Sequence, residues 1–207
     1  MIEVLISNKF NYLLLIICYF IGSIPFGYIF YKIIKKDDIR KYGSGNIGAT
    51  NVNRLIGKKF GALTLVLDFI KTFFPCLLIH MHFGIETGVL SGFFTVIGHI
   101  FPIWLKFKGG KGVASFMAFI LVTSWPFFII FSISWLITVK IFKYSSLAAI
   151  ISIIINLIIF KLTLYLQFNY SLVLWIPGEP IEFKFTLLLS IIILCNHYSN
   201  IIDMLRK

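Results

Sequence analysis

Long apolar runs alternate with short polar segments along almost the whole chain. Because a helix needs about 20 residues to cross roughly 30 Å of hydrocarbon, runs of this length predict membrane-spanning helices. Five such runs are clear, at residues 10–34, 60–79, 85–105, 147–166 and 183–202. The first contains Gly22, Pro25 and Gly27, which interrupt it, and a polar stretch at 35–59 follows.

The apolar run at 113–142 is too long for a single span. Ser124-Trp125-Pro126 divides it, because proline ends one helix or begins the next. We expect two short spans here, and one tilted helix is the alternative. The pattern therefore predicts an all-α integral membrane protein with about seven transmembrane helices, in a single membrane domain over residues 1–207.

Composition supports this fold class. Of the 207 residues, 59% are hydrophobic and only 13% are charged, and the mean hydropathy is +0.96. A soluble domain is nearer half apolar and a quarter charged, so this composition excludes one. Cys18, Cys76 and Cys195 all lie in apolar runs, which indicates small core residues and not a disulfide framework or a metal site.

The net charge of +11 is concentrated in the short segments between the spans. A basic chain can bind nucleic acid, but this distribution indicates membrane topology and phosphate binding, so we expect no nucleic-acid partner. With seven spans, only Lys9, Lys161 and Lys184 fall on one side. Fifteen cations fall on the other: Lys32, Lys35, Lys36, Arg40, Lys41, Arg54, Lys58, Lys59, Lys106, Lys108, Lys111, Lys140, Lys143, Arg206 and Lys207. The positive-inside rule then predicts an outer N-terminus and a cytosolic C-terminus.

The segment from Gly43 to Arg54 is rich in glycine and in hydrogen-bonding side chains. Successive glycines let backbone N–H groups converge on an anion, while arginine, serine, threonine and asparagine add charge and donors. The candidate residues are Gly43, Ser44, Gly45, Asn46, Thr50, Asn51 and Arg54. Residues 43–48 also match a dinucleotide-binding pattern, but no βαβ unit is possible in this chain. A flexible loop remains the alternative.

A second segment, 106–112, reads Lys-Phe-Lys-Gly-Gly-Lys-Gly. It is not a Walker A loop, because Gly112 stands where serine or threonine should follow the lysine. We interpret it as a phosphate nest that leads into a helix, whose N-terminal dipole and free N–H groups favour an anion. The candidate residues are Lys108, Gly109, Gly110, Lys111 and Gly112. A cluster that serves only membrane topology is the alternative.

The predicted spans 60–79 and 85–105 carry titratable residues, with Asp68 and Lys71 in the first and His99 near the end of the second. Asp68 and Lys71 are three apart on one helix face, so we expect them to form a buried ion pair. His99 is interpreted as a structural histidine bonded to a backbone carbonyl. His80 and His82 are expected in a short outer loop, too isolated to bind a metal.

The chain also lacks several catalytic signatures. No histidine is followed five positions later by aspartate, so the His-x4-Asp dyad of the common glycerolipid acyltransferases is absent.

Glu179 and Glu182 fall on the outer side and are expected to be solvated. We expect no metal and no cofactor.

The two glycine segments, taken with three further stretches, resemble the bacterial acylphosphate:glycerol-3-phosphate acyltransferases (PlsY). The resemblance covers nearly the whole chain in order and spacing. Its motifs are Gly43-Ser44-Gly45-Asn46 with Gly48-Ala49-Thr50-Asn51 and Arg54, then Gly98-His99 and Phe101-Pro102 before 106–112, then His197 and Asn200. The chain departs from the family pattern at Tyr198 and Asp203, where basic residues are usual.

The resemblance implies a seven-helix enzyme of the bacterial inner membrane with its active site at the cytosolic face. It would transfer a fatty acyl group from acyl phosphate to the 1-hydroxyl of glycerol 3-phosphate, giving lysophosphatidic acid. Its partners would be these two substrates, the lipid bilayer and an upstream enzyme that forms acyl phosphate. By position in the motifs, catalytic roles are implied for Ser44, Arg54, His197 and Asn200, and phosphate binding for Lys111, Gly109, Gly110, Gly112 and Ser146.

A second function class fits basic loops at a membrane face, namely a non-catalytic carrier for an organic phosphate. A carrier should offer polar groups through the bilayer and often has inverted repeats. The predicted outer half of this chain is almost wholly apolar, and no repeat is visible. The pattern therefore favours the enzyme.

Overall fold

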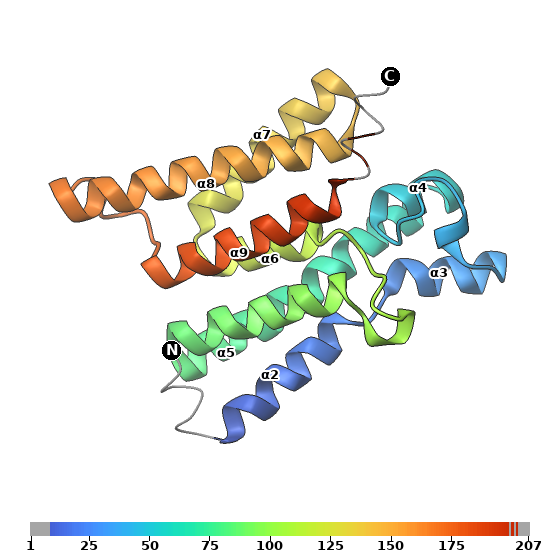
Figure 1. Ribbon diagram of the computed structural model, residues 1–207, viewed down its shortest axis with the longest axis horizontal. Coiled ribbons are helices and arrows are strands. Elements are labelled where there is room, and N and C mark those ends of the chain that lie inside the picture. The colour runs from blue at the N-terminus through green and yellow to red at the C-terminus, as the bar shows by residue number, and fades with distance from the viewer. Residues whose placement is uncertain (1–8, 199, 201, 203–207) are drawn as a thin grey trace. The chain divides into compact units, whose positions relative to one another are not determined.

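The computed structural model describes residues 9–198, 200 and 202, and this part of the chain consists of helices joined by short loops (Figure 1). The chain divides into two compact units, Met1–Phe119 and Ile120–Lys207. The fold class predicted from the apolar runs is confirmed. The single domain expected over residues 1–207 stays a prediction.

The first unit begins with two helices that a predicted break separates. They are α2 (Lys9–Gly22) and α3 (Phe26–Lys35). Pro25 precedes α3, and its missing N–H and fixed φ end the regular hydrogen-bond ladder at this point. Gly22 packs so closely on the backbone of Thr95 that an added Cβ would overlap the Thr95 carbonyl. The interruptions seen in the sequence therefore mark a true helix break.

Two short helices follow, η1 (Ile39–Lys41) and α4 (Ala49–Ile56). They lead into the longest element, α5 (Lys58–Ile100). Within α5, Gly84 has non-helical backbone angles, φ 83° and ψ 178°, which only glycine adopts readily. Cys76 Sγ lies 3.4 Å from the Gly88 carbonyl, whereas residues this far apart in a straight helix are separated by about 18 Å. The chain therefore folds back at Gly84.

This hairpin corrects one detail of the predicted spans. The fold-back was expected as a loop that carries His80 and His82, but the helix continues through both, and the turn is at Gly84. Gly88 packs against His80, and Gly92 packs against Cys76, so small residues let the two halves of α5 approach closely. We call residues 58–83 the first half and residues 85–100 the second half of α5.

The apolar run at 113–142 contains two helices, α6 (Val113–Thr123) and α7 (Trp125–Phe142), as the first of the two alternatives predicted. Ser124 has an extended backbone between them, with φ −157° and ψ 100°. Pro126 lies in the first turn of α7, where its missing N–H costs no hydrogen bond.

The rest of the second unit is built by α8 (Ser145–Tyr170) and α9 (Pro180–Asn196). Phe127 of α7 stacks on Phe160 of α8 with ring centroids 4.1 Å apart, and Phe183 of α9 contacts Phe160 edge-on. These aromatic contacts hold the three helices together.

Both final helices differ from their predicted bounds. α8 extends past the expected 147–166 at both ends. α9 begins before residue 183 because Glu179 and Glu182 form a capping box, in which the Glu182 carboxylate accepts the Glu179 N–H. Glu182 is only 2% exposed, so the expectation that it is solvated was wrong.

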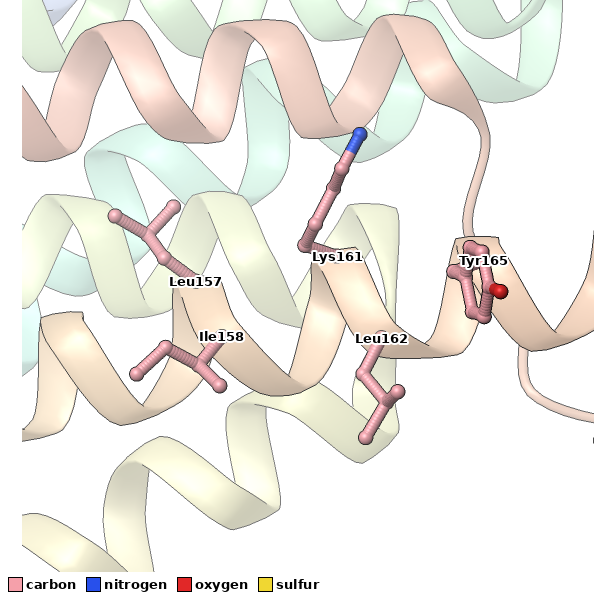
Figure 2. A pocket seen from close by; sticks show the side chains of 5 residues that line it. All are labelled: Leu157, Ile158, Lys161, Leu162 and Tyr165. Carbon is pink, nitrogen blue, oxygen red and sulfur yellow. The ribbon is translucent and has the colours of Figure 1, made fainter.

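Apolar side chains cover much of the surface. Four helical stretches in the described part of the chain are long and apolar enough to span a membrane: Tyr12–Lys35, Lys58–Leu105, Trp125–Phe142 and Ser145–Tyr170. An apolar groove of about 480 Å³ lies on α8, lined by Leu157, Ile158, Lys161, Leu162 and Tyr165. Figure 2 shows these five side chains on the helix. Cys195 is also exposed, unlike the core position expected for it, whereas Cys18 and Cys76 are buried. Such a surface suits contact with lipid.

Candidate active site

The first glycine loop requires glycine at two positions. Gly43 and Gly45 have φ values of 62° and 68°, in the left-handed region that side chains disfavour. A Cβ at Gly43 would also overlap Asn51 Oδ1. The backbone can therefore bend sharply around Ser44 and leave this residue exposed at the apex.

The buried amide of Asn51 holds this loop in shape. Its Oδ1 accepts the Ser44 N–H at 3.0 Å, and its Nδ2 donates to the carbonyls of Asn46 at 2.8 Å and Tyr42 at 3.1 Å. Asn46 Oδ1 in turn accepts the Gly48 N–H at 2.8 Å, just before α4. The side-chain amide of Asn51 thus bonds only groups of the loop itself in these contacts, so Asn51 is a positioning residue.

We expect Asn51→Asp to lower activity through the loop. The carboxylate can still accept the Ser44 N–H, but it has no donor for the two carbonyls and places a charge at a site that is 1% exposed. Leaving buried groups unpaired typically costs about 1–3 kcal/mol. Thermal melting and kcat/KM should both fall. Asn53→Asp, at an exposed position in the same helix, is the control and should leave both unchanged.

The exposed face of the first loop offers side-chain donors for which the described part of the chain shows no partner. Ser44, Thr50 and Arg54 are exposed. Arg54 Nη1 lies 3.6 Å from where a Gly43 Cβ would be, so the guanidinium lies beside the bend. Arg54 forms no ion pair within the described residues. The arrangement is a cation next to hydroxyl and helix-start donors, which is suited to a phosphate.

Other cations near the loop are already neutralised by carboxylates. Arg40 Nη2 lies 2.6 Å from Asp38 Oδ2, and Lys41 Nζ lies 2.8 Å from Asp37 Oδ1. The hydrogen bond from Arg40 lowers the pKa of Asp38, and that from Lys41 lowers the pKa of Asp37. Both carboxylates therefore stay ionised at neutral pH, and Arg54 carries the positive charge that the loop presents.

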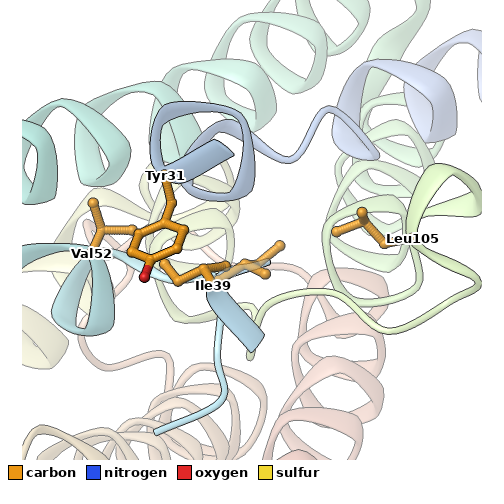
Figure 3. Close-up of a cluster of buried hydrophobic side chains, with 5 residues drawn as sticks. Tyr31, Ile39, Val52 and Leu105 are labelled. Carbon is orange, nitrogen blue, oxygen red and sulfur yellow. The ribbon is translucent and has the colours of Figure 1, made fainter. Parts of the chain in front are cut away.

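A small apolar cluster brings the second glycine segment against the base of the first. Figure 3 shows Tyr31, Ile39, Val52 and Leu105, which are buried together with Ile47. Leu105 ends η2 (Ile103–Leu105), the turn just before the second segment. Arg40 Nη1 also donates to the Leu105 carbonyl at 3.1 Å. The two segments singled out in the sequence are thus fixed to one scaffold.

The second segment folds back on the end of α5. The N–H groups of Gly109 and Gly110 donate to the carbonyls of Ile100 and His99, at 3.0 and 3.1 Å. These two amides are therefore not free for an anion, which corrects the predicted nest. The first backbone bond of α6 is from Phe116 to the Gly112 carbonyl, at 2.8 Å. The amides of residues 113–115 consequently have no backbone acceptor in the described part of the chain, and they are the donors that the segment can offer.

Lys111 and Lys108 flank the two glycines. Lys108 is exposed and Lys111 is half-buried at the entrance to α6. Gly112 has φ 88°, which turns the backbone from the loop into the helix. A lysine beside an open helix N-terminus is again an arrangement that favours an anion.

The third group of candidates belongs to the second unit. Ser146 lies half-buried in the first turn of α8, and His197 is buried at the end of α9. His197 Nδ1 is 2.8 Å from the Ile193 carbonyl, so Nδ1 carries the hydrogen and Nε2 is the acceptor of the neutral ring. Asn200 is half-buried, while Asp203 lies outside the described residues. Their meeting with the two glycine segments stays a prediction.

No group of three or more histidine, cysteine, aspartate or glutamate side chains within the described ranges could hold a metal ion. The predicted Asp68–Lys71 ion pair is confirmed, with Nζ 2.8 Å from Oδ1 and both side chains buried. His99 was expected to bond a backbone carbonyl, but its Nδ1 faces Asp68 Oδ1 at 3.5 Å. Sequence reasoning missed this partner because 31 positions separate the two residues.

Comparisons with known proteins agree with this arrangement. The family model described as glycerol-3-phosphate acyltransferase matches residues 12–207. The glycerol-3-phosphate acyltransferase of Ehrlichia canis is 42% identical over 194 residues, 93% of this chain and 94% of that protein. The enzyme of the same name from Bartonella henselae is 40% identical over 195 residues, 92% of this chain and 86% of that protein.

A solved structure shares the fold. It is PlsY (YgiH), an integral membrane glycerol 3-phosphate acyltransferase, in its glycerol 3-phosphate form. The TM-score is 0.82 at 33% identity, over 95% of this chain and 92% of the other. The lysophosphatidic acid form of PlsY matches with a TM-score of 0.78 over the same shares. Because the family model and these relatives cover nearly the whole of this all-helical chain, it belongs to the glycerol-3-phosphate acyltransferase family and is a membrane acyltransferase.

Proposed function

We propose that this acyltransferase takes its acyl group from acyl phosphate and transfers it to the 1-hydroxyl of glycerol 3-phosphate. The observation that carries the proposal is the exposed face of the first loop, where Arg54 lies beside the Ser44 bend and pairs with no carboxylate of the described residues. The PlsY structures in glycerol 3-phosphate and lysophosphatidic acid forms support the acceptor and the product.

The second segment supports a phosphorylated donor. Both substrates would then carry a phosphate, and each glycine segment of the first unit has its own cation. Arg54, in the last turn of α4, lies beside the bend at Gly43, and Lys111 lies at the entrance to α6. In acyl phosphate the phosphate is bonded directly to the reacting acyl group, whereas in acyl-CoA the phosphates lie a long pantetheine arm away from the thioester. Two phosphate sites on one scaffold therefore favour acyl phosphate. The substrate whose KM rises in a variant of either segment identifies the phosphate that binds at that segment.

The chemistry then needs little from side chains. The glycerol hydroxyl oxygen attacks the acyl carbon, the new ester C–O bond forms, and the bond from that carbon to the phosphate oxygen breaks. The hydroxyl proton ends on the released inorganic phosphate. Because phosphate is already a good leaving group, the protein has mainly to align the two substrates and to neutralise their charge. A substrate phosphate takes the proton in this scheme, and the His197 ring, whose Nδ1 bonds the Ile193 carbonyl, is the alternative acceptor.

We assign these roles to individual residues on the same basis. Ser44 and Arg54 contact one phosphate, with Thr50 and the start of α4 beside them. Lys111 and the amides at the start of α6 contact the other, with Lys108 at the rim. For His197, Asn200 and Ser146 of the second unit, the roles that their positions in the family motifs imply stay a prediction. Gly43, Gly45, Gly109, Gly110 and Gly112, with Asn46 and Asn51, shape the loops.

The donor can be tested with the purified protein in detergent. Labelled glycerol 3-phosphate is supplied with palmitoyl phosphate, palmitoyl-CoA or palmitoyl-acyl carrier protein in parallel, and lysophosphatidic acid is measured. We expect product with palmitoyl phosphate alone. Equal rates with palmitoyl-CoA would rule the proposed donor out, while leaving the acyltransferase assignment in place.

We further propose that the loops face the cytosol at the bacterial inner membrane, because fifteen of the nineteen lysines and arginines fall on that side in the seven-span topology. In a variant without native cysteines, Ser44→Cys and Lys108→Cys should resist a membrane-impermeant thiol reagent added to intact cells. Leu174→Cys, exposed between α8 and α9, should react. The opposite labelling pattern would invert the proposed orientation.

A further inference from the structure

Three titratable side chains lie buried together in the first unit. Asp68 Oδ1 is 2.8 Å from Lys71 Nζ and 3.5 Å from His99 Nδ1, and none of the three side chains is more than 4% exposed. Asp68 and Lys71 come from the first half of α5, whereas His99 comes from the second half. The cluster therefore joins the two halves of the hairpin.

The same cluster reaches two further elements. Lys71 Nζ donates to the Ile24 carbonyl at 2.8 Å, at the break between α2 and α3. Ser115 Oγ, in the first turn of α6, donates to the Asp68 backbone carbonyl at 3.0 Å. The helix that the second glycine segment begins is thus fastened to the cluster directly.

His99 also packs against the glycine segment itself. The three atoms nearest to a Cβ built on Gly110 all belong to the His99 ring, and Nε2 would overlap that Cβ. The φ of Gly110 lies outside the left-handed region, so glycine is needed here for close approach to the ring and not for its backbone conformation. The position of the His99 ring therefore limits how closely the 108–112 segment can pack on the end of α5.

A buried ion pair contributes little net stability compared with apolar residues of the same size. Its cost is understandable if the pair has a geometric task. Asp68, which pairs with Lys71, places its carboxylate 3.5 Å from His99 Nδ1, a contact and not a hydrogen bond in this structure, and the opposite edge of the same ring meets Gly110.

We propose that Asp68, Lys71 and His99 form a positioning network. It fixes how closely the 108–112 segment packs on the end of α5, and with it the position of Lys111 and of the open start of α6. None of the three touches substrate in this proposal. It rests on the proposed binding of a substrate phosphate at the second segment. It adds to the reaction three residues, two of them outside the glycine motifs, that act through the geometry of that segment.

The test is a double-mutant cycle between His99 and Gly110. In Gly110→Ala, the new methyl group meets the His99 ring and should displace the segment. We expect KM for one of the two substrates to rise roughly tenfold or more, with each substrate varied in turn. In His99→Asn, the shorter amide can still face Asp68 but vacates the Nε2 edge. The double variant should therefore reverse most of the rise in KM that Gly110→Ala causes.

Gly88→Ala is the matched control, because it also places a methyl group against a histidine, His80, near the Gly84 turn. It should lower the melting temperature and leave both KM values unchanged. Effects of Gly110→Ala and His99→Asn that simply add, with no recovery in the double variant, would overturn the proposal. A fall in kcat that only follows the fraction of unfolded protein, with KM unchanged, would also overturn the proposal.

A second variant covers the case in which Gly110→Ala does not accumulate. His99→Ala removes the ring, and the protein that folds should show a KM raised roughly tenfold for the same substrate. An unchanged KM would contradict the positioning role. If the wild-type enzyme used palmitoyl-CoA instead of palmitoyl phosphate, the proposed donor would fail, but the cycle would still be measurable with that donor.

Discussion

Arg54→Ala is expected to insert and fold normally and to lose most of its activity. The guanidinium is exposed beside Gly43, outside the hydrogen bonds by which Asn51 shapes the loop, so its removal leaves the loop intact. A hydrogen bond to a charged group is typically worth about 1.5–3 kcal/mol. Losing it in the transition state should lower kcat/KM by roughly ten- to a hundredfold or more. Initial rates and thermal melting of the purified variant check this.

Three comparison variants make the Arg54 result specific. Arg54→Lys keeps the charge but loses the planar fork, so it should fall between wild type and Arg54→Ala. Lys58→Ala and Lys143→Ala remove exposed cations that we interpret as topology charges, and they should retain activity within about twofold. Activity of Arg54→Ala close to wild type, or a loss that follows a lower melting temperature, would contradict a phosphate contact at this residue.

Local sequence signals predicted much of the fold. Pro25 and Pro126 marked helix boundaries because proline lacks the N–H that a helix interior needs. The charges at Asp68 and Lys71 predicted a buried pair because isolated charges are costly among apolar residues. The left-handed angles at Gly43 and Gly45 agree with the glycine spacing that first indicated a shaped loop.

What could not be predicted depends on contacts between distant parts of the chain. The N–H groups of Gly109 and Gly110 looked free, but the end of α5 takes them up. Glu182 looked solvated because its partner, the N–H that begins α9, is a backbone group. The loop predicted at 80–84 was too long, because helical residues such as His80 and His82 carry no signal that distinguishes them from a polar loop, and only Gly84 leaves the helix.

The largest effect on stability should come from breaking the buried pair on one side only. Lys71→Met leaves the Asp68 carboxylate buried without its cation, and removing one partner of such a pair typically costs about 3–5 kcal/mol. For a chain of this size we expect the melting temperature to fall by about 10 °C. Lys161→Met, at an exposed position on α8, is the matched control and should change it little.

Replacing both partners separates stability from function. In Asp68→Leu with Lys71→Met no buried charge of the pair remains, and apolar replacement of a buried pair is often neutral or stabilising. The melting temperature should therefore return close to that of wild type. The carboxylate that faces His99 is nevertheless gone, so the ring and the 108–112 segment lose their alignment and KM for one substrate should stay raised. A double variant that regained both stability and a normal KM would show that the pair serves folding alone, because the segment would then keep its position without the carboxylate.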